Sequence, residues 1–164
     1  LASRPVLRCT ALGLVLGLVG MALPLTLFLG TDGLVDVTSD PAALGAGLIL
    51  VSALVKILAT TGALSFGFVG GPIFPLLFVG GSFGTVIHLA IDGIPLGLAV
   101  VAMMVAVPSS VIPVPLSIAT LTVLIAGIPP SESTSVFVAA IVALIAGRVI
   151  ETTLPKPAKA PGDE

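Results

Sequence analysis

The length of the uncharged stretches limits the fold of this sequence more than any other feature. Residues 93–131 form 39 consecutive positions without Asp, Glu, Lys or Arg, and residues 9–31 form another 23. A helix needs about 20 consecutive apolar residues to cross a bilayer, so such stretches are typical of membrane spans. Only 9% of all residues are charged, whereas a soluble domain has about 25%. The sequence therefore predicts an all-α integral membrane protein with multiple spans.

Charge and composition also argue against other classes of protein. The net charge is −2, and Tyr and Trp are absent, so a basic, aromatic surface for nucleic acid has nothing to be built from. No His-Glu-x-x-His pattern is present, as a metalloprotease would need. Ser65, Ser82 and His88 are the only material for a serine hydrolase near the centre of the chain. We therefore expect no enzymatic activity, no metal site and no cofactor.

The apolar residues fall into six segments, several of them shorter than a full span. These segments cover residues 10–30, 42–66, 75–91, 96–107, 116–126 and 136–150. The polar residues 31–41 predict an aqueous connection, and Pro108 predicts a break, because Pro removes a hydrogen-bond donor from a helix. Broken or re-entrant helices are typical of transporters and channels. We expect residues 1–150 to form one membrane domain and the polar residues 151–164 to form a mobile tail.

A Gly-rich and Pro-rich loop, residues 67–75, is the segment best suited to bind a ligand. It reads Gly-Phe-Val-Gly-Gly-Pro-Ile-Phe-Pro and carries no charge that would hold it in water. Pro75 suits the first turn of a helix, so we expect a helix to start at or next to it. The unpaired N–H groups of that turn, together with the amides of Ile73 and Phe74, predict an anion site. Gly71 lets the backbone approach the anion closely.

These donors are too few to compensate by themselves for the free energy of dehydrating an anion. Moving a bare ion into a medium of low dielectric costs of the order of tens of kcal/mol, and each charge-assisted hydrogen bond returns about 1.5 to 3 kcal/mol. Further donors are therefore expected from a partner chain or from sequence outside this one. Lys56 lies within the second apolar segment. Its charge can raise the anion potential of the loop, or its side chain can extend to the membrane interface.

The motifs around the loop resemble the second half of the CLC-type chloride channels and chloride/proton antiporters. The resemblance rests mainly on Lys-Ile-Leu-Ala-Thr-Thr at residues 56–61, Gly-Gly-Pro-Ile-Phe-Pro at 70–75 and Phe-Val-Gly-Gly at 78–81. It implies half of an inverted-repeat CLC fold, in which this chain is the C-terminal repeat and begins within a longer protein. It further implies an N-terminal CLC repeat as partner, assembly into a homodimer, and a multi-pass location in the cell membrane.

The resemblance also implies which residues bind the ion. The backbone of Ile73 and Phe74 would hold a chloride or related halide, supported by Gly71 and Pro75, with electrostatic support from Lys56. The family's Tyr hydroxyl has no counterpart, because the sequence contains no Tyr. Three alternatives stay open at this point: a chloride channel or proton-coupled antiporter, a fluoride or other anion transporter of the same fold, and a non-conducting membrane scaffold.

Overall fold

The computed structural model describes residues 5–26, 30–131 and 133–153, and every regular element in these ranges is helical. The elements in chain order are α1 (Pro5–Ala22), the 3-10 turn η1 (Pro24–Thr26), α2 (Thr31–Ser39), α3 (Pro41–Ser65), α4 (Ile73–Ala90), α5 (Leu96–Val111), α6 (Pro115–Ala126) and α7 (Ser133–Thr153). The helices α3, α4 and α7 are long and apolar enough to cross a membrane. The expected all-α membrane class is therefore confirmed. Most of the predicted tail, residues 154–164, lies outside the described residues.

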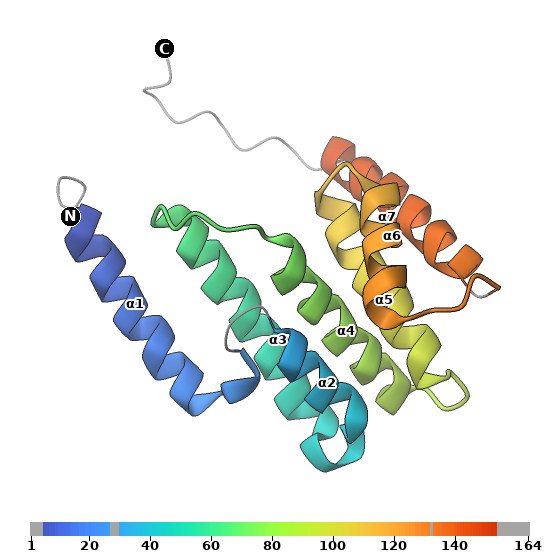
Figure 1. Cartoon of the computed structure of the whole chain (residues 1–164), viewed down its shortest axis with the longest axis horizontal. Helices are drawn as coiled ribbons and strands as arrows, with labels where there is room; N and C mark the ends of the chain where they lie inside the picture. Colours follow the sequence, from blue (N-terminus) through green and yellow to red (C-terminus); the bar gives the residue numbers. More distant parts are fainter. Residues whose placement is uncertain (1–4, 27–29, 132, 154–164) are drawn as a thin grey trace.

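The long helices follow one another across the molecule. Figure 1 shows α1 at one end beside α3, then α4, and a group formed by α5, α6 and α7 at the other end. The short helix α2 packs against α3 and α4. The contact between α4 and α5 is the most extensive of all helix pairs in the described part of the chain. The central helix α4 is thus held from both sides.

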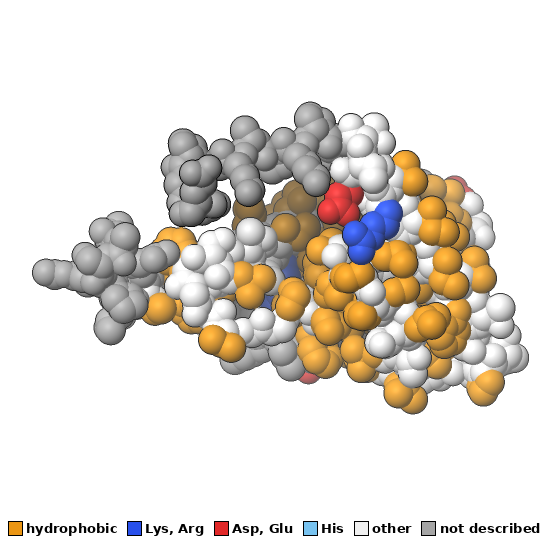
Figure 2. Space-filling model, turned by 90° about the horizontal axis from the view of Figure 1, so that it is seen from above, with side chains coloured by type: hydrophobic (Ala, Val, Ile, Leu, Met, Phe, Trp, Pro, Cys, Tyr) orange, Lys and Arg blue, Asp and Glu red, His pale blue; other side chains and the backbone are white. Residues whose placement is uncertain are grey.

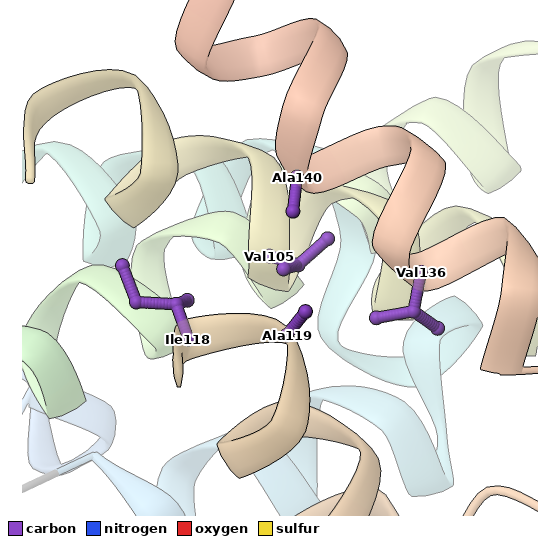
Figure 3. Packing of buried hydrophobic residues seen from close by; sticks show 5 residues of the cluster. All are labelled: Val105, Ile118, Ala119, Val136 and Ala140. Carbon is purple, nitrogen blue, oxygen red and sulfur yellow. The ribbon is translucent and has the colours of Figure 1, made fainter. Parts of the chain in front are cut away.

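The packing of α5 against α6 and α7 forms one hydrophobic core. Figure 3 shows Val105 of α5 between Ile118 and Ala119 of α6 and Val136 and Ala140 of α7. Each of these residues is at most 2% exposed. The two alanines keep the side chains short at the contact, so the helices approach closely. This core fixes the C-terminal group of helices as one unit.

Glycines of α4 bring its backbone against that of α5. A Cβ built on Gly84 would lie 2.6 Å from the Cα of Val100, and one built on Gly80 would lie 2.8 Å from the Cα of Met104. Only a hydrogen fits at these positions, which is how small residues let membrane helices pack. The position of α4, and with it the position of its first turn, is therefore set by backbone contact.

The outer surface of the molecule is largely apolar. Hydrophobic side chains cover much of the face seen in Figure 2. Only 22% of the most apolar 18-residue window of α3 is buried, and only 11% of that of α7. Leu58 of α3 and Val142 of α7, for example, are 72% and 58% exposed. Apolar surface of this extent is what a membrane protein presents to lipid or to further transmembrane helices.

The predicted aqueous connection over residues 31–41 is helical for most of its length. Residues Thr31–Ser39 form α2, and Val37 on this helix is completely buried. Asp32 and Asp36 stay exposed on the opposite side. The sequence predicted no helix in this segment, but its apolar residues have helical spacing and lie on the buried side of α2. The true connection to α3 is Asp40.

The predicted break at Pro108 is wrong. Helix α5 continues through Pro108 to Val111 and ends at Ile112, which has extended backbone. Pro108 is buried, and α5 packs against both α4 and α7. Neighbouring helices commonly stabilise a proline in a membrane helix, and only one turn follows it here. Pro115 occupies the first turn of α6, a position that suits proline.

Candidate functional site

The loop between α3 and α4 begins with a defined helix end. The N–H of Phe68 donates to the carbonyl oxygen of Ala63 at 3.0 Å, and the N–H of Gly67 donates to that of Leu64 at 3.1 Å. Gly67 has φ +90°, a value that favours glycine. This pair of bonds is a Schellman motif, which satisfies the last carbonyls of α3 and turns the chain away from the helix axis. The following residues, Val69 to Gly71, are exposed.

Helix α4 begins at Ile73, two residues before the predicted start. The N–H of Leu76 donates to the carbonyl oxygen of Pro72 at 3.0 Å, which is the first hydrogen bond of the helix. Pro75 is therefore the third helical residue, where a missing N–H still costs nothing. No side chain caps this end of α4. Within the described residues the N–H groups of Ile73 and Phe74 have no acceptor, so two main-chain donors are available.

A cavity of about 260 Å³ lies beside this helix end. It is open on one side and is lined by residues of α1, η1, α3, the loop and the first turn of α4. Its polar side chains are Thr26, Lys56 and Thr60, and none of its described lining residues is Asp or Glu. The lining residues are Leu16, Val19, Gly20, Thr26, Lys56, Ala59, Thr60, Ala63, Leu64, Phe68, Gly70, Gly71 and Pro75.

The Lys56 side chain turns inward, toward the cavity. This residue is 3% exposed, and its Nζ donates to the carbonyl oxygen of Thr26 at 2.8 Å. The same Nζ lies 5.7 Å from the centroid of the Phe78 ring, within the range of a cation–π interaction. The alternative in which Lys56 extends to the membrane interface is not the conformation adopted. The amino group of a buried basic side chain therefore stands in the wall of the cavity.

The structure brings three of the five predicted site residues to one place. Lys56, Gly71 and Pro75 line the cavity, whereas Ile73 and Phe74 do not. The side chains of Ile73 and Phe74 pack instead against the buried cluster of Leu77, Val100 and Met104. Their main-chain N–H groups lie in the first turn of α4, and their predicted role as donors to an anion stays a prediction.

Sequence reasoning missed three residues of this site. Thr60 was detectable, because it follows Lys56 by four residues and therefore shares its face of α3. Thr26 and Phe78 carried no such signal. They contact Lys56 from η1 and from α4, and both contacts depend on how separate helices pack. The hydroxyl of Thr26 is used locally, since it donates to the carbonyl oxygen of Leu23 at 2.8 Å.

The residues considered for a serine hydrolase do not form a catalytic arrangement in the described part of the chain. Ser65 Oγ donates to the carbonyl oxygen of Thr61 at 2.8 Å, and His88 Nδ1 donates to that of Ile94 at 2.7 Å. Sequence reasoning overlooked that residues 80–84 read Gly-Gly-Ser-Phe-Gly, a Gly-x-Ser-x-Gly pattern. A hydrolase places this serine on an exposed turn between a strand and a helix. Here Ser82 lies inside α4 and is completely buried.

Comparison with known proteins finds a matching family profile and several similar curated proteins. A family profile described as "Voltage gated chloride channel" matches residues 1–155. Curated relatives named "Putative ion-transport protein YfeO" come from Salmonella newport (strain SL254) and Salmonella agona (strain SL483). Each is 37% identical over 99 residues, which cover 60% of this chain and 24% of the relative. The chain thus matches about a quarter of the length of these relatives. No solved structure matches it significantly.

Proposed function

This chain belongs to the voltage-gated chloride channel family, and we propose that it forms the C-terminal repeat of an anion transport protein in the cell membrane. The name of the curated relatives, an ion-transport protein, supports transport as the activity. Chloride, or a related halide, is the proposed ion. Because the match covers 24% of these relatives, the complete pathway is proposed to include an N-terminal repeat, and the active protein to be a multi-pass homodimer.

The start of α4 carries this proposal. The N–H groups of Ile73 and Phe74 are available for an anion, and the positive end of the helix dipole lies at the same place. The adjacent cavity contains the charge of Lys56 and the backbone of Gly71. A halide held between these groups meets main-chain donors on one side and a positive potential on the other. Pro75 has no N–H, so it adds no further main-chain donor to the first turn of α4.

The described donors leave room for contributions from other parts of the protein. Two main-chain hydrogen bonds to a halide return about 3 to 6 kcal/mol together, which is far less than the cost of dehydrating the ion. The loop residues Val69 to Gly71 are exposed, so another surface has access to the same place. We infer that the N-terminal repeat completes the coordination of the ion there.

Replacing Gly71 by Val tests the proposed binding site. A Cβ on Gly71 meets no atom within 4 Å, so the described structure accommodates the change, while the branched side chain occupies the approach to the α4 donors. We expect chloride flux into liposomes to fall more than about tenfold at unchanged expression. Gly47→Val is the matched control, because this glycine of α3 also has open space around it. Undiminished flux in Gly71→Val would contradict the site.

Competition among anions tests the identity of the ion and the mode of transport. Chloride, nitrate and fluoride are supplied separately to liposomes containing the purified protein, and proton movement is recorded at the same time. Chloride flux that nitrate inhibits is the expected result. Flux of fluoride with rejection of chloride would overturn the chloride assignment. Proton movement in the direction opposite to the chloride flux, and coupled to it, would identify an antiporter. Chloride flux without such proton movement would identify a channel.

A further inference from the structure

Phe78 occupies a central place behind the candidate anion site. It belongs to α4, about one turn after the free N–H groups, and is 1% exposed. It is the largest of the completely buried side chains of the described residues. It belongs to a buried hydrophobic cluster with Ile49 of α3, Val37 of α2 and Val79 of α4. Phe78 does not line the cavity, so any effect it has on an ion must pass through another residue.

Two glycines fix the position of the Phe78 side chain. A Cβ on Gly30 would lie 2.8 Å from the Cβ of Phe78, and one on Gly33 would lie 3.2 Å from its Cε2. Gly30 has φ +88°, which favours glycine. The backbone at the start of α2 therefore lies directly against Phe78. Close packing of this kind restricts the rotamers of Phe78, so the ring presents a fixed face.

The fixed face of Phe78 lies next to the ammonium group of Lys56. The Nζ stands 5.7 Å from the ring centroid and 2.8 Å from the carbonyl oxygen of Thr26. The Lys side chain is flexible, and an unrestrained ammonium would sample many positions. The Phe78 ring and the Thr26 carbonyl attract it from two different elements, α4 and η1. Both contacts help to hold the ammonium at the wall of the cavity.

We propose that Phe78 is a positioning residue, which holds the Lys56 ammonium in place and thereby sets the affinity of the cavity for anions. This inference rests on the proposed function, because it assigns an ion to the same cavity. The potential of a charge falls with distance, so an ammonium that leaves the wall contributes less to anion binding. The ligand class is a small monovalent anion, and chloride is the probe.

A double-mutant cycle tests the coupling between Phe78 and Lys56. Chloride binding to the purified full-length protein, which includes the proposed N-terminal repeat, is measured by isothermal titration calorimetry in wild type, Phe78→Leu, Lys56→Met and the double variant. A desolvated cation–π interaction corresponds to a change of about tenfold or more in affinity. We expect each single variant to bind chloride about tenfold more weakly, and the double variant to bind no more weakly than Lys56→Met.

Phe83→Leu is the matched control for the loss of ring volume. Phe83 lies on the same helix and packs against the same hydrophobic cluster, but no cation lies over its ring in the described part of the chain. Its substitution should leave chloride affinity unchanged. A further variant keeps the shape of the core: 3,4,5-trifluorophenylalanine in place of Phe78 weakens the negative face of the ring at nearly constant volume. We expect it to reduce chloride affinity in the same direction as Phe78→Leu.

The outcomes separate this inference from the proposed function. Independent, additive losses in the double variant would overturn the positioning role of Phe78, as would full chloride affinity in the fluorinated protein. In either case, weaker chloride binding by Lys56→Met would still support the proposed anion site. Absence of chloride binding in the wild-type protein would instead contradict the proposed function itself. Size-exclusion profiles of all variants establish that the protein remains folded.

Discussion

The first turns of α3 and α4 differ in what happens to their main-chain donors. At α3 the carboxylate of Asp40 accepts a hydrogen bond from the N–H of Ala43 at 3.1 Å, and Pro41 occupies the first helical position. At α4 the preceding residue is Pro72, and no side chain caps the helix. At α3 a side chain of the chain itself accepts from a main-chain donor of the first turn. At α4 the main-chain donors of the first turn remain available. An anion site needs the second kind of end, because a capping carboxylate would occupy the donors and repel the ion.

The two ends also differ in their surroundings. Asp40 and Ala43 are exposed, so water can satisfy any donor that the carboxylate does not reach. The α4 end lies beside the cavity that contains Lys56 and Gly71. Donors beside protein atoms of low dielectric interact more strongly with an anion than donors in bulk water. The comparison therefore teaches that an uncapped helix end becomes a candidate site where the fold also places a basic side chain beside it.

The largest effect is expected from breaking the support that holds the α4 end in place. In Gly84→Val the new side chain collides with the backbone of Ala99 and Val100. Overpacking of a core costs about 1 to 3 kcal/mol, and backbone atoms cannot move aside as side chains do. We expect loss of most of the folded protein, measured as monodisperse yield and thermal unfolding in detergent. Normal yield and thermal stability would show that α4 is not held by this contact.

The next effect comes from converting the α4 end into an α3-like end. Pro72→Asp places a carboxylate beside the N–H groups of Ile73 and Phe74 and frees the backbone of residue 72 for capping geometry. We expect anion flux to fall by about tenfold or more, while thermal stability stays the same or rises, since a cap stabilises a helix by about 1 kcal/mol. Pro72→Ala is the control, because it adds no acceptor. Equal flux in Pro72→Asp and Pro72→Ala would contradict the role of these donors.

The smallest effect is expected from removing the cap of α3. Asp40→Ala leaves the N–H of Ala43 to water and should destabilise the protein by about 1 kcal/mol. The change is measured by thermal unfolding. Asp40→Asn retains an acceptor and should recover most of the stability. Chloride flux should be unaffected in both variants, and a strong reduction of flux would mean that the α3 end also belongs to the ion pathway.

The sequence predicted most helices of this protein because their signals are local. The segments expected at 42–66 and 116–126 correspond to α3 (Pro41–Ser65) and α6 (Pro115–Ala126), where a proline starts each helix. The errors also have local causes. No helix was predicted for residues 31–41, although their apolar residues have helical spacing and bury Val37. Pro108 was judged by its own chemistry, although the neighbours of α5 decided its conformation.

The candidate site was predictable to a smaller extent. Gly71, Pro75 and the N–H groups of Ile73 and Phe74 were predictable because prolines and glycines act on the backbone next to them. The start of α4 was misplaced by two residues, since a proline is accepted anywhere in a first turn. Whether these groups bind an anion stays a prediction until flux and binding are measured.

By itself, then, the sequence determined that this chain is a helical membrane protein with an uncapped helix start after a Gly-rich and Pro-rich loop. Hydrophobic length and backbone chemistry act within a few residues, so both can be read along the chain. Only the tertiary structure decided where the charge of Lys56 lies. Its partner Thr26 is 30 residues away in the sequence and belongs to another element, and Phe78 belongs to a third. Contacts between separate helices depend on which faces pack together, and hydrophobic composition leaves that choice open.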